Sequence, residues 1–170
     1  MAEPRVGRPH IPGYGIPDDD GAGTLPWSWA REQLEHALIY WVASVKPNGH
    51  AHVMPTWAAW VDDRLYFEGG LQTRRARNIS ANPWVSAGIN DRNQAVIVEG
   101  EARNIAPLED ERLVSALLDG YAKYRASDSY EADAANWRDP AGGLWELRPR
   151  VAFGWRTFPD TTTRWHFDED

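Results

Sequence analysis

Three short strand-like segments joined by two tight turns place the strongest constraint on the fold of this chain. Residues 38–46, 50–61 and 64–67 are rich in β-branched and aromatic side chains and have the lengths of strands. Residues 47–49 (PNG) and 62–63 (DD) between them have the composition of turns. Strands this close in sequence pair as antiparallel neighbours, because a parallel pair needs a long crossover. The segment therefore predicts an antiparallel meander.

Further strands are expected at residues 84–89, 95–105, 144–155 and 162–167. Gly100 indicates a β-bulge or a close backbone approach, and Pro149 must lie at an edge or bulge because it has no N–H group. With few helices beside these strands, the chain is predicted to be mainly β, as a six- to seven-stranded antiparallel barrel.

Two longer helices are expected beside the strands. Thr24 is a candidate cap for a helix that runs to about Ala37, and residues 107–125 carry acids in the first turns followed by an apolar stripe. Residues 1–24 are rich in Pro, Gly and Asp and are predicted to form an extended arm. Residues 25–170 are then expected to form a single domain, since this length is sufficient for one substantial core.

Residues 66–83 contain a local group of hydrogen-bond donors that suit a phosphate. A strand end runs into a loop with two glycines, followed at the start of a predicted short helix by Thr73, Arg74, Arg75 and Arg77. Guanidinium groups, a hydroxyl and the free N–H groups of a helix start are the donors that hold phosphate. We therefore predict a site for a small phosphorylated ligand. A solvated helix face paired with acids is the alternative, and it stays open for the whole run.

Composition excludes several classes of function. The net charge is -7 and the pI about 5.2, so binding of nucleic acid over a broad basic face is not expected. The chain has no cysteine, which fits a cytosolic, cytoplasmic protein. The first 15 residues have no apolar run typical of a signal peptide, and no segment has the length of a membrane span. Some of the ten tryptophans are expected to line a pocket or a subunit interface.

Three other motifs favour structural explanations over chemical ones. His50 and His52 lie on one face of a strand, but no third ligand is visible nearby, so no metal site is predicted. Residues 18–20 (DDD) lack the alternation of a calcium loop. Ser44 and Ser86 have no nucleophile-elbow context, so hydrolase chemistry has little support.

The order of these segments resembles a known superfamily. Its most specific marks are residues 75–78 (RARN) followed by 82–83 (NP), and residues 98–100 (VEG) further along the chain. Over about residues 26–155 the chain resembles the pyridoxamine 5'-phosphate oxidase-like superfamily, the FMN-binding split β-barrels. It looks closer still to the actinobacterial flavin/deazaflavin oxidoreductases, some of which use coenzyme F420.

The resemblance implies a homodimer with two cofactor sites in clefts between the subunits. By motif position, Arg75 matches the family's phosphate-binding Lys/Arg, and Thr73 and Arg74 match the hydroxyl and basic positions ahead of it. The strand whose backbone faces the cofactor ring matches Met54, Pro55, Thr56 and Trp57.

The departures from the family pattern bear on the substrate. The true pyridoxamine phosphate oxidases have an Arg and a Lys on the second strand, whereas residues 52–60 (HVMPTWAAW) contain neither. The residues that grip a pyridoxal phosphate substrate are also not evident near the C-terminus. Oxidation of vitamin B6 is therefore not expected, and a cavity lined by Trp57, Trp60 and Trp155 would favour a planar or apolar substrate.

The resemblance implies an oxidoreductase that transfers a hydride between bound F420 or FMN and a small planar substrate. F420 is preferred because its acidic tail needs positive charge at the cleft mouth, which could come from Arg74, Arg77, Arg5 or Arg8. The catalytic residues are unknown from the sequence, with Tyr66, Tyr121 or Glu99 as candidates for a proton donor. The alternatives are a non-catalytic protein that carries the cofactor and a pure dimerisation module.

Overall fold

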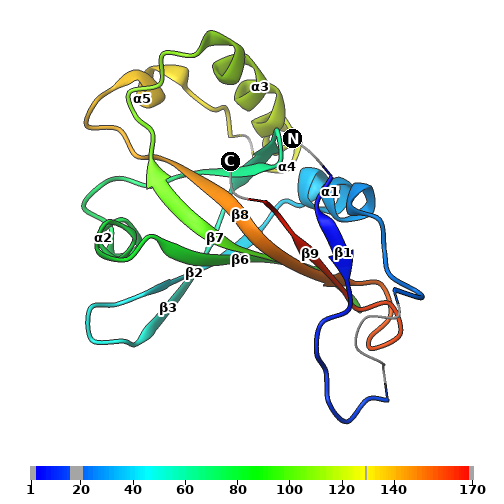
Figure 1. Ribbon diagram of the computed structural model, residues 1–170. Helices are drawn as coiled ribbons and strands as arrows, with labels where there is room; N and C mark the ends of the chain where they lie inside the picture. Colours follow the sequence, from blue (N-terminus) through cyan, green and yellow to red (C-terminus); the bar gives the residue numbers. More distant parts are fainter. Residues whose placement is uncertain (1–2, 16–20, 129, 169–170) are drawn as a thin grey trace.

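The computed structural model describes residues 3–15, 21–128 and 130–168, which form a mainly antiparallel β structure with a few short helices (Figure 1). The strands are β1 (Arg5–Gly7), β2 (Tyr40–Val45), β3 (Ala51–Thr56), β4 (Ala58–Val61), β5 (Arg64–Glu68), β6 (Trp84–Asp91), β7 (Gln94–Asn104), β8 (Leu144–Trp155) and β9 (Thr163–His166). The helices are α1 (Trp27–His36), α2 (Arg74–Ala81), α3 (Glu111–Tyr121), α4 (Tyr124–Asp128) and α5 (Ala134–Arg138).

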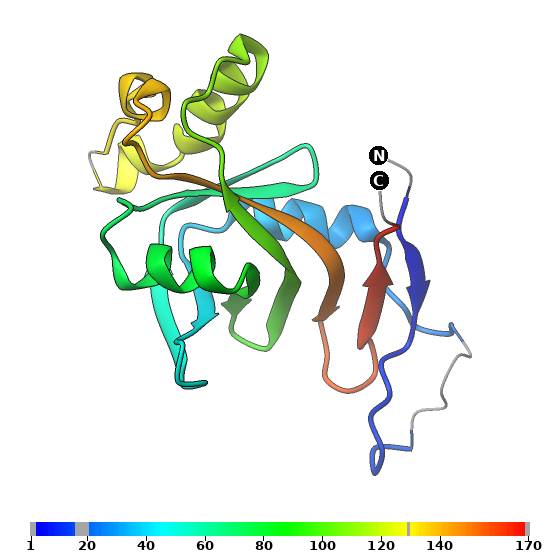
Figure 2. The ribbon, with the colours of Figure 1, turned by 60° about the vertical axis from the view of Figure 1, so that its left-hand side comes forward.

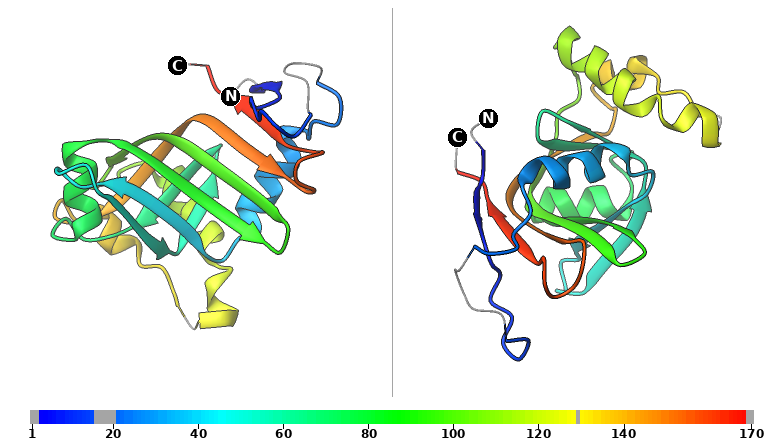
Figure 3. Two further views of the ribbon diagram at one scale, coloured as in Figure 1. Left: turned by 90° about the horizontal axis from the view of Figure 1, so that it is seen from below. Right: turned by 90° about the vertical axis from the view of Figure 1, so that its right-hand side faces the viewer.

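All strands belong to one sheet, which is strongly curved (Figure 3). The order is β1-β9-β8-β7-β6-β2-β3, and β5 pairs with both β4 and β8. The first residues of β8 pair with β5, its last residues pair with β9, and β7 runs beside most of its length. In the described part of the chain no ladder joins β3 to β4, so closure of the barrel stays a prediction.

The predicted class is confirmed, but the predicted number of strands is wrong. The sheet has nine strands instead of six or seven. The expected strand at residues 50–61 divides at Trp57 into β3 and β4, which pair with different neighbours. The other addition, β1, lies in the expected arm and pairs with β9. Three residues carry too short a pattern to predict such a strand. The division into an arm and one domain stays a prediction.

The N-terminal ends of α1 and α3 differ from the prediction. Pro26 occupies the N-cap position of α1 and makes no side-chain cap, while the hydroxyl of Thr24 donates to a carbonyl in the preceding turn. The predicted Thr24 cap is therefore wrong. Helix α3 begins later than expected, after Asp110, whose carboxylate accepts the N–H groups of Arg112 and Leu113.

The predicted turn and bulge are both confirmed. Asp62 and Asp63 have φ of 50° and 56°, the left-handed values that a tight hairpin turn requires. The pairing of β7 with β8 shifts register between Glu99 and Gly100. A Cβ atom on Gly100 would lie 1.9 Å from the carbonyl oxygen of Arg148, so this position accepts no side chain.

Two apolar clusters stabilise the fold. The first lies between the sheet and α1, where Trp27 makes edge-to-face contacts with Trp60 and Trp165. The second lies beneath α3 and α5 on the other face of β5 and β8, with Tyr121 and Trp137 buried in it. Figure 2 shows these two helices gathered at one end of the molecule, away from α1. No helix in the described residues is long and apolar enough to cross a membrane.

Lys123 connects the end of α3 to α1. Its ammonium group donates to the carbonyl of Glu35 at 2.9 Å and to the hydroxyl of Tyr40 at 3.0 Å, and it lies over the rings of Tyr40 and Tyr124. Burial lowers the pKa of Lys123 to about 8, because desolvation disfavours the charged amine.

This depressed pKa predicts a pH-dependent stability difference. Between about pH 8 and 10 the unfolded chain holds the Lys123 proton more firmly than the folded protein, so stability rises with pH in this window. Relative to Lys123→Met, the wild type should gain about 1–3 kcal/mol between pH 7 and pH 10. Denaturant unfolding at both pH values measures this gain, with Lys46→Met as the control. An unchanged difference between wild type and Lys123→Met would contradict the prediction.

Candidate functional site

The loop between β5 and α2, residues 69–73, is fixed against the start of β8. The N–H group of Gly69 donates to the carbonyl of Gly143 at 2.8 Å, and the N–H group of Thr73 donates to Gly70 at 3.0 Å. The carbonyl of Gly69 accepts the indole N–H of Trp145 at 2.8 Å. A Cβ atom on Gly143 would lie 2.0 Å from this same oxygen, so the two backbones approach too closely for a side chain.

The predicted short helix is confirmed as α2, and Thr73 is its N-cap. The Thr73 hydroxyl oxygen accepts the N–H group of Ala76 at 3.2 Å, and its carbonyl accepts the N–H group of Arg77. Within the described residues, the N–H groups of Arg74 and Arg75 have no partner. The helix start therefore presents two N–H donors and the hydroxyl proton of Thr73.

Arg75 points back toward the end of β5. Its guanidinium lies 4.8 Å from the centre of the Phe67 ring and donates to the carbonyl of Glu68 at 2.6 Å. Burial lowers the pKa of Arg75, because the charged group is partly removed from water. Arg74 and Arg77 are exposed. The three arginines thus differ: Arg75 is held in one orientation, and the other two extend into solvent.

The predicted ring-binding strand presents an open surface. Met54 and Pro55 are exposed, and Thr56 is partly buried. Trp57 instead turns toward the helical segments, where its ring contacts Tyr124 at 5.4 Å and Tyr130 at 4.8 Å between centroids. The first three residues are available to a ligand, whereas the Trp57 side chain belongs to the second cluster.

Two hollows flank residues 69–73. One, of about 520 Å³, is lined by Gly70, Leu71, Gln72, Thr73 and Ala141. The other, of about 460 Å³, is lined by Glu68, Gly69, Gly70, Asn136, Trp137, Asp139, Ala141, Gly142 and Gly143. Neither is lined by Arg75 or by any residue of β3. The structure thus brings Thr73 to a hollow but does not join the two predicted parts of the site within one cavity.

The expected tryptophan-lined cavity is wrong. Trp60 is buried in the first apolar cluster, Trp57 packs in the second, and Trp155 contacts Phe158 at 5.6 Å between ring centroids. The three residues lie in different layers of the fold. Their spacing along the strands could not reveal this, because tryptophan packs equally well in a core and in a pocket.

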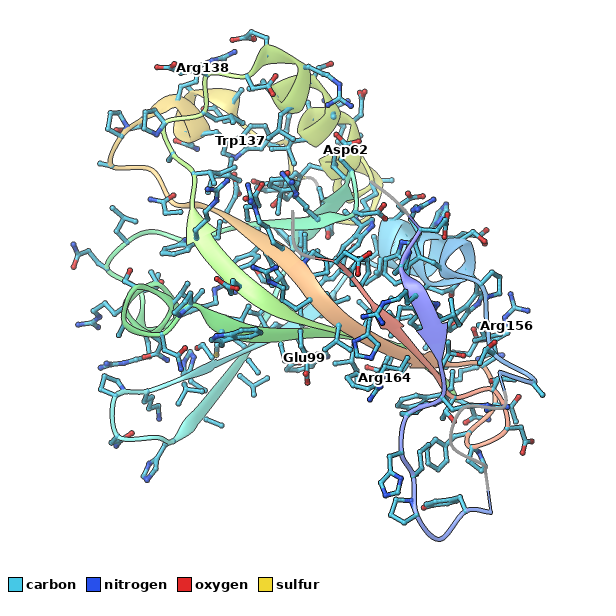
Figure 4. All side chains as sticks on the ribbon, in the orientation of Figure 1. Asp62, Glu99, Trp137, Arg138, Arg156 and Arg164 are labelled. Atoms are coloured by element: carbon cyan, nitrogen blue, oxygen red, sulfur yellow. The ribbon has the colours of Figure 1, made fainter. Side chains whose placement is uncertain are left out.

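Glu68 is a site residue that the sequence did not reveal. One carboxylate oxygen accepts the indole N–H of Trp137 at 2.5 Å, and the other accepts the hydroxyl of Tyr130. Burial raises the pKa of Tyr130, and the bond to the Glu68 carboxylate raises it further. Figure 4 shows Trp137 between α5 and the sheet. Glu68 therefore holds the segment after α4 against the edge of the candidate site, a long-range contact without a local motif.

None of the candidate proton donors lines either hollow. The Tyr66 hydroxyl donates to Glu146 at 3.3 Å, and burial raises the pKa of Tyr66 to about 12. The Tyr121 hydroxyl donates to the carbonyl of Tyr66 at 3.1 Å, and its pKa is also raised by burial. Glu99 lies on the outer face of β7 (Figure 4). Across the described ranges, no group of His, Asp and Glu side chains could hold a metal ion.

The arginines of the expected arm do not reach α2. Arg8 is buried, and its guanidinium donates to the carbonyls of Ala22, Asp160 and Thr162. Arg5 lies 3.6 Å from Asp168. Both lie at or next to β1, at the opposite end of the sheet order from β3, so their contribution of charge at the mouth of a cleft between subunits stays a prediction. Residues 18–20 lie outside the described residues.

Comparison with known proteins decides the family. The sequence pattern described as pyridoxamine 5'-phosphate oxidase matches residues 29–156, well over half of the chain. The chain belongs to the pyridoxamine 5'-phosphate oxidase family. The resemblance seen in the sequence is therefore confirmed. No curated protein matches the chain significantly.

Solved structures with the family fold have varied descriptions. An F420 reductase is 27% identical, with a TM-score of 0.54 over 72% of this chain and 94% of its own. A pyridoxamine 5'-phosphate oxidase-related, FMN-binding protein from Nostoc punctiforme is 18% identical, with a TM-score of 0.55 over 85% and 92%. A heme-binding protein from Mycobacterium smegmatis is 16% identical, with a TM-score of 0.58 over 76% and 53%.

Proposed function

We propose that this family member is an oxidoreductase that binds F420 or FMN and transfers a hydride between the cofactor and a small planar organic substrate. The carrying observation is the donor set at the start of α2, where Thr73 and two N–H groups with no partner among the described residues begin the helix that also carries Arg75, whose guanidinium is fixed at the end of β5. This set fits the phosphate of either cofactor. Membership of the family and likeness to an F420 reductase support the assignment.

The residues of this chain would have distinct roles in holding the cofactor. Thr73 and the N–H groups of Arg74 and Arg75 would donate to the phosphate, and the half-buried Arg75 would add a fixed positive charge. The backbone of residues 54–57 would support the ring. A bound flavin or deazaflavin supplies the hydride chemistry itself. The exposed Arg74 and Arg77 favour F420, because its acidic tail would lie near them.

The assembly proposed with this function is a homodimer with a cofactor site at each subunit junction. The outer face of β2, β3 and β6 exposes apolar side chains that water solvates poorly, with Trp41 48%, Val53 50% and Trp84 52% exposed. Because neither hollow unites β3 with Arg75, a second subunit over this face would complete an enclosed site.

Titration of the protein with FMN and, separately, with F420 tests the proposal. Fluorescence quenching measures the binding of each cofactor. Tight binding of F420 alone supports a deazaflavin-dependent reductase, and tight binding of FMN alone supports a flavoprotein. Binding of neither would overturn the function and the phosphate site together. Sedimentation at several concentrations tests the dimer separately.

The alternative is a non-catalytic protein that carries the cofactor. It is favoured by the inward orientation of Tyr66 and Tyr121, which leaves no tyrosine among the candidates to exchange a proton with a substrate. A carrier should bind the cofactor tightly yet never change its redox state with quinone or enone acceptors. Steady oxidation of the reduced cofactor by any such acceptor would exclude the carrier.

A further inference from the structure

A buried carboxylate organises arginines on the outer face of β7 and β8. The Glu146 side chain is 3% exposed, and one of its oxygens accepts the Nε–H groups of Arg103 and Arg148, each at 2.9 Å. Its other oxygen accepts from Arg64 at 3.0 Å and from Tyr66 at 3.3 Å. A carboxylate has about four acceptor positions, so Glu146 is saturated.

Arg103 and Arg148 each retain guanidinium N–H donors that Glu146 does not use. Each uses its Nε–H on Glu146, and the terminal nitrogens of both have no partner in the described part of the chain. Their side chains are 59% and 40% exposed, so these nitrogens are open to solvent. The two guanidiniums together carry one more charge than Glu146, which also bonds Arg64.

The neighbouring acid does not compensate this charge. Glu101 stands opposite Arg148 in the β7–β8 ladder, but its carboxylate accepts two hydrogen bonds from Arg150. Like-charged guanidiniums held against one oxygen repel each other, and an anion between their terminal nitrogens would relieve this repulsion. Because Glu146 already fixes their orientation, less side-chain entropy is lost when the anion binds.

We propose that Arg103 and Arg148 form a binding site for the phosphate or carboxylate group of a small molecule, on the outer face of β7 and β8. This site lies on β7 and β8, apart from the donors at the start of α2. It does not rest on the proposed oxidoreductase function. Guanidinium forks suit both groups, because each presents paired oxygens to parallel N–H donors.

The side-chain Nε–H signals of the arginines give a local test by nuclear magnetic resonance. Titration with inorganic phosphate and, separately, with glutarate should shift the Arg103 and Arg148 signals along a saturating curve. The affinity ratio of the two arms shows which group the site prefers. The signal of Arg112, which pairs with Asp62 at 3.0 Å, is the reference. Chloride at equal ionic strength controls for screening, and equal shifts with chloride, or no shifts, would overturn the proposal.

Variants provide a second, independent test. Arg103→Gln and Arg148→Gln should each weaken binding about tenfold, corresponding to the loss of one charge-assisted hydrogen bond at an exposed position. Arg112→Gln should leave the affinity unchanged. Glu146→Gln should lower the thermal midpoint, because three arginines lose the charge of their shared acceptor. Unaltered affinity in both arginine variants would refute the site, even if the Glu146 variant does not fold.

Discussion

Replacement of Arg75 by alanine should weaken cofactor binding by about tenfold to a hundredfold. A hydrogen bond to a charged group contributes roughly 1.5–3 kcal/mol, and about 1.4 kcal/mol corresponds to a factor of ten in affinity. Arg75 is the arginine of the α2 run whose guanidinium is fixed by a protein acceptor and an aromatic ring. Its orientation is therefore set before a ligand arrives. Fluorescence titration of the variant with F420 and with FMN measures the loss.

The matched control is Arg77→Ala, an exposed residue in the same helix. Arg77 is expected to act on the phosphate through its charge alone. The loss of cofactor affinity in Arg77→Ala should therefore be several-fold smaller than the loss in Arg75→Ala. Because Arg75 also holds the end of β5, thermal unfolding must show that Arg75→Ala remains folded at the assay temperature. A folded Arg75→Ala variant with wild-type affinity would exclude Arg75 from the phosphate site and leave Thr73 and the helix N–H groups as the remaining donors.

Local patterns in the sequence were sufficient to predict most elements of the sheet. The strand predicted at residues 144–155 has the same bounds in β8, because its apolar residues, with charged ones at every second position from 146 to 150, form a local strand pattern. Gly100 predicted the bulge for a similar reason, since a glycine within a strand is a local signal. The division at Trp57 was missed because residues on both sides of it have strand character, and only the change of pairing partner separates them.

The candidate site was predictable in part. The run from Thr73 to Arg77 pointed to a helix start with donors, and that helix is present. The sequence could not distinguish the fixed Arg75 from its exposed neighbours, because the ring and carbonyl that hold it belong to β5. Glu68 and Glu146 escaped notice for the same reason. Their partners lie as far as 69 and 82 residues away along the chain, and no spacing rule covers such contacts.

A substitution at Gly143 should disrupt the loop before α2 and destabilise the protein. In Gly143→Ala the new Cβ atom would lie 2.0 Å from the carbonyl oxygen of Gly69 and 2.6 Å from its carbonyl carbon. These are backbone atoms, so relief requires the loop to move away from β8. That movement would break the bond from Gly69 N–H to Gly143 and deprive the buried Trp145 of its indole acceptor.

The expected loss of unfolding free energy is about 3 kcal/mol, because overpacking and an unsatisfied buried donor act together. Denaturant unfolding measures it, and cofactor titration of the folded fraction should show weakened binding, since the displaced loop carries Thr73 and the start of α2 with it. Gly70→Ala is the matched control: a Cβ atom there would meet no atom within 4 Å. If Gly143→Ala were as stable as Gly70→Ala, the close approach of the loop to β8 would not exist in solution. If Gly143→Ala were unstable but its folded fraction bound the cofactor normally, the loop would not position the groups that donate hydrogen bonds to the phosphate.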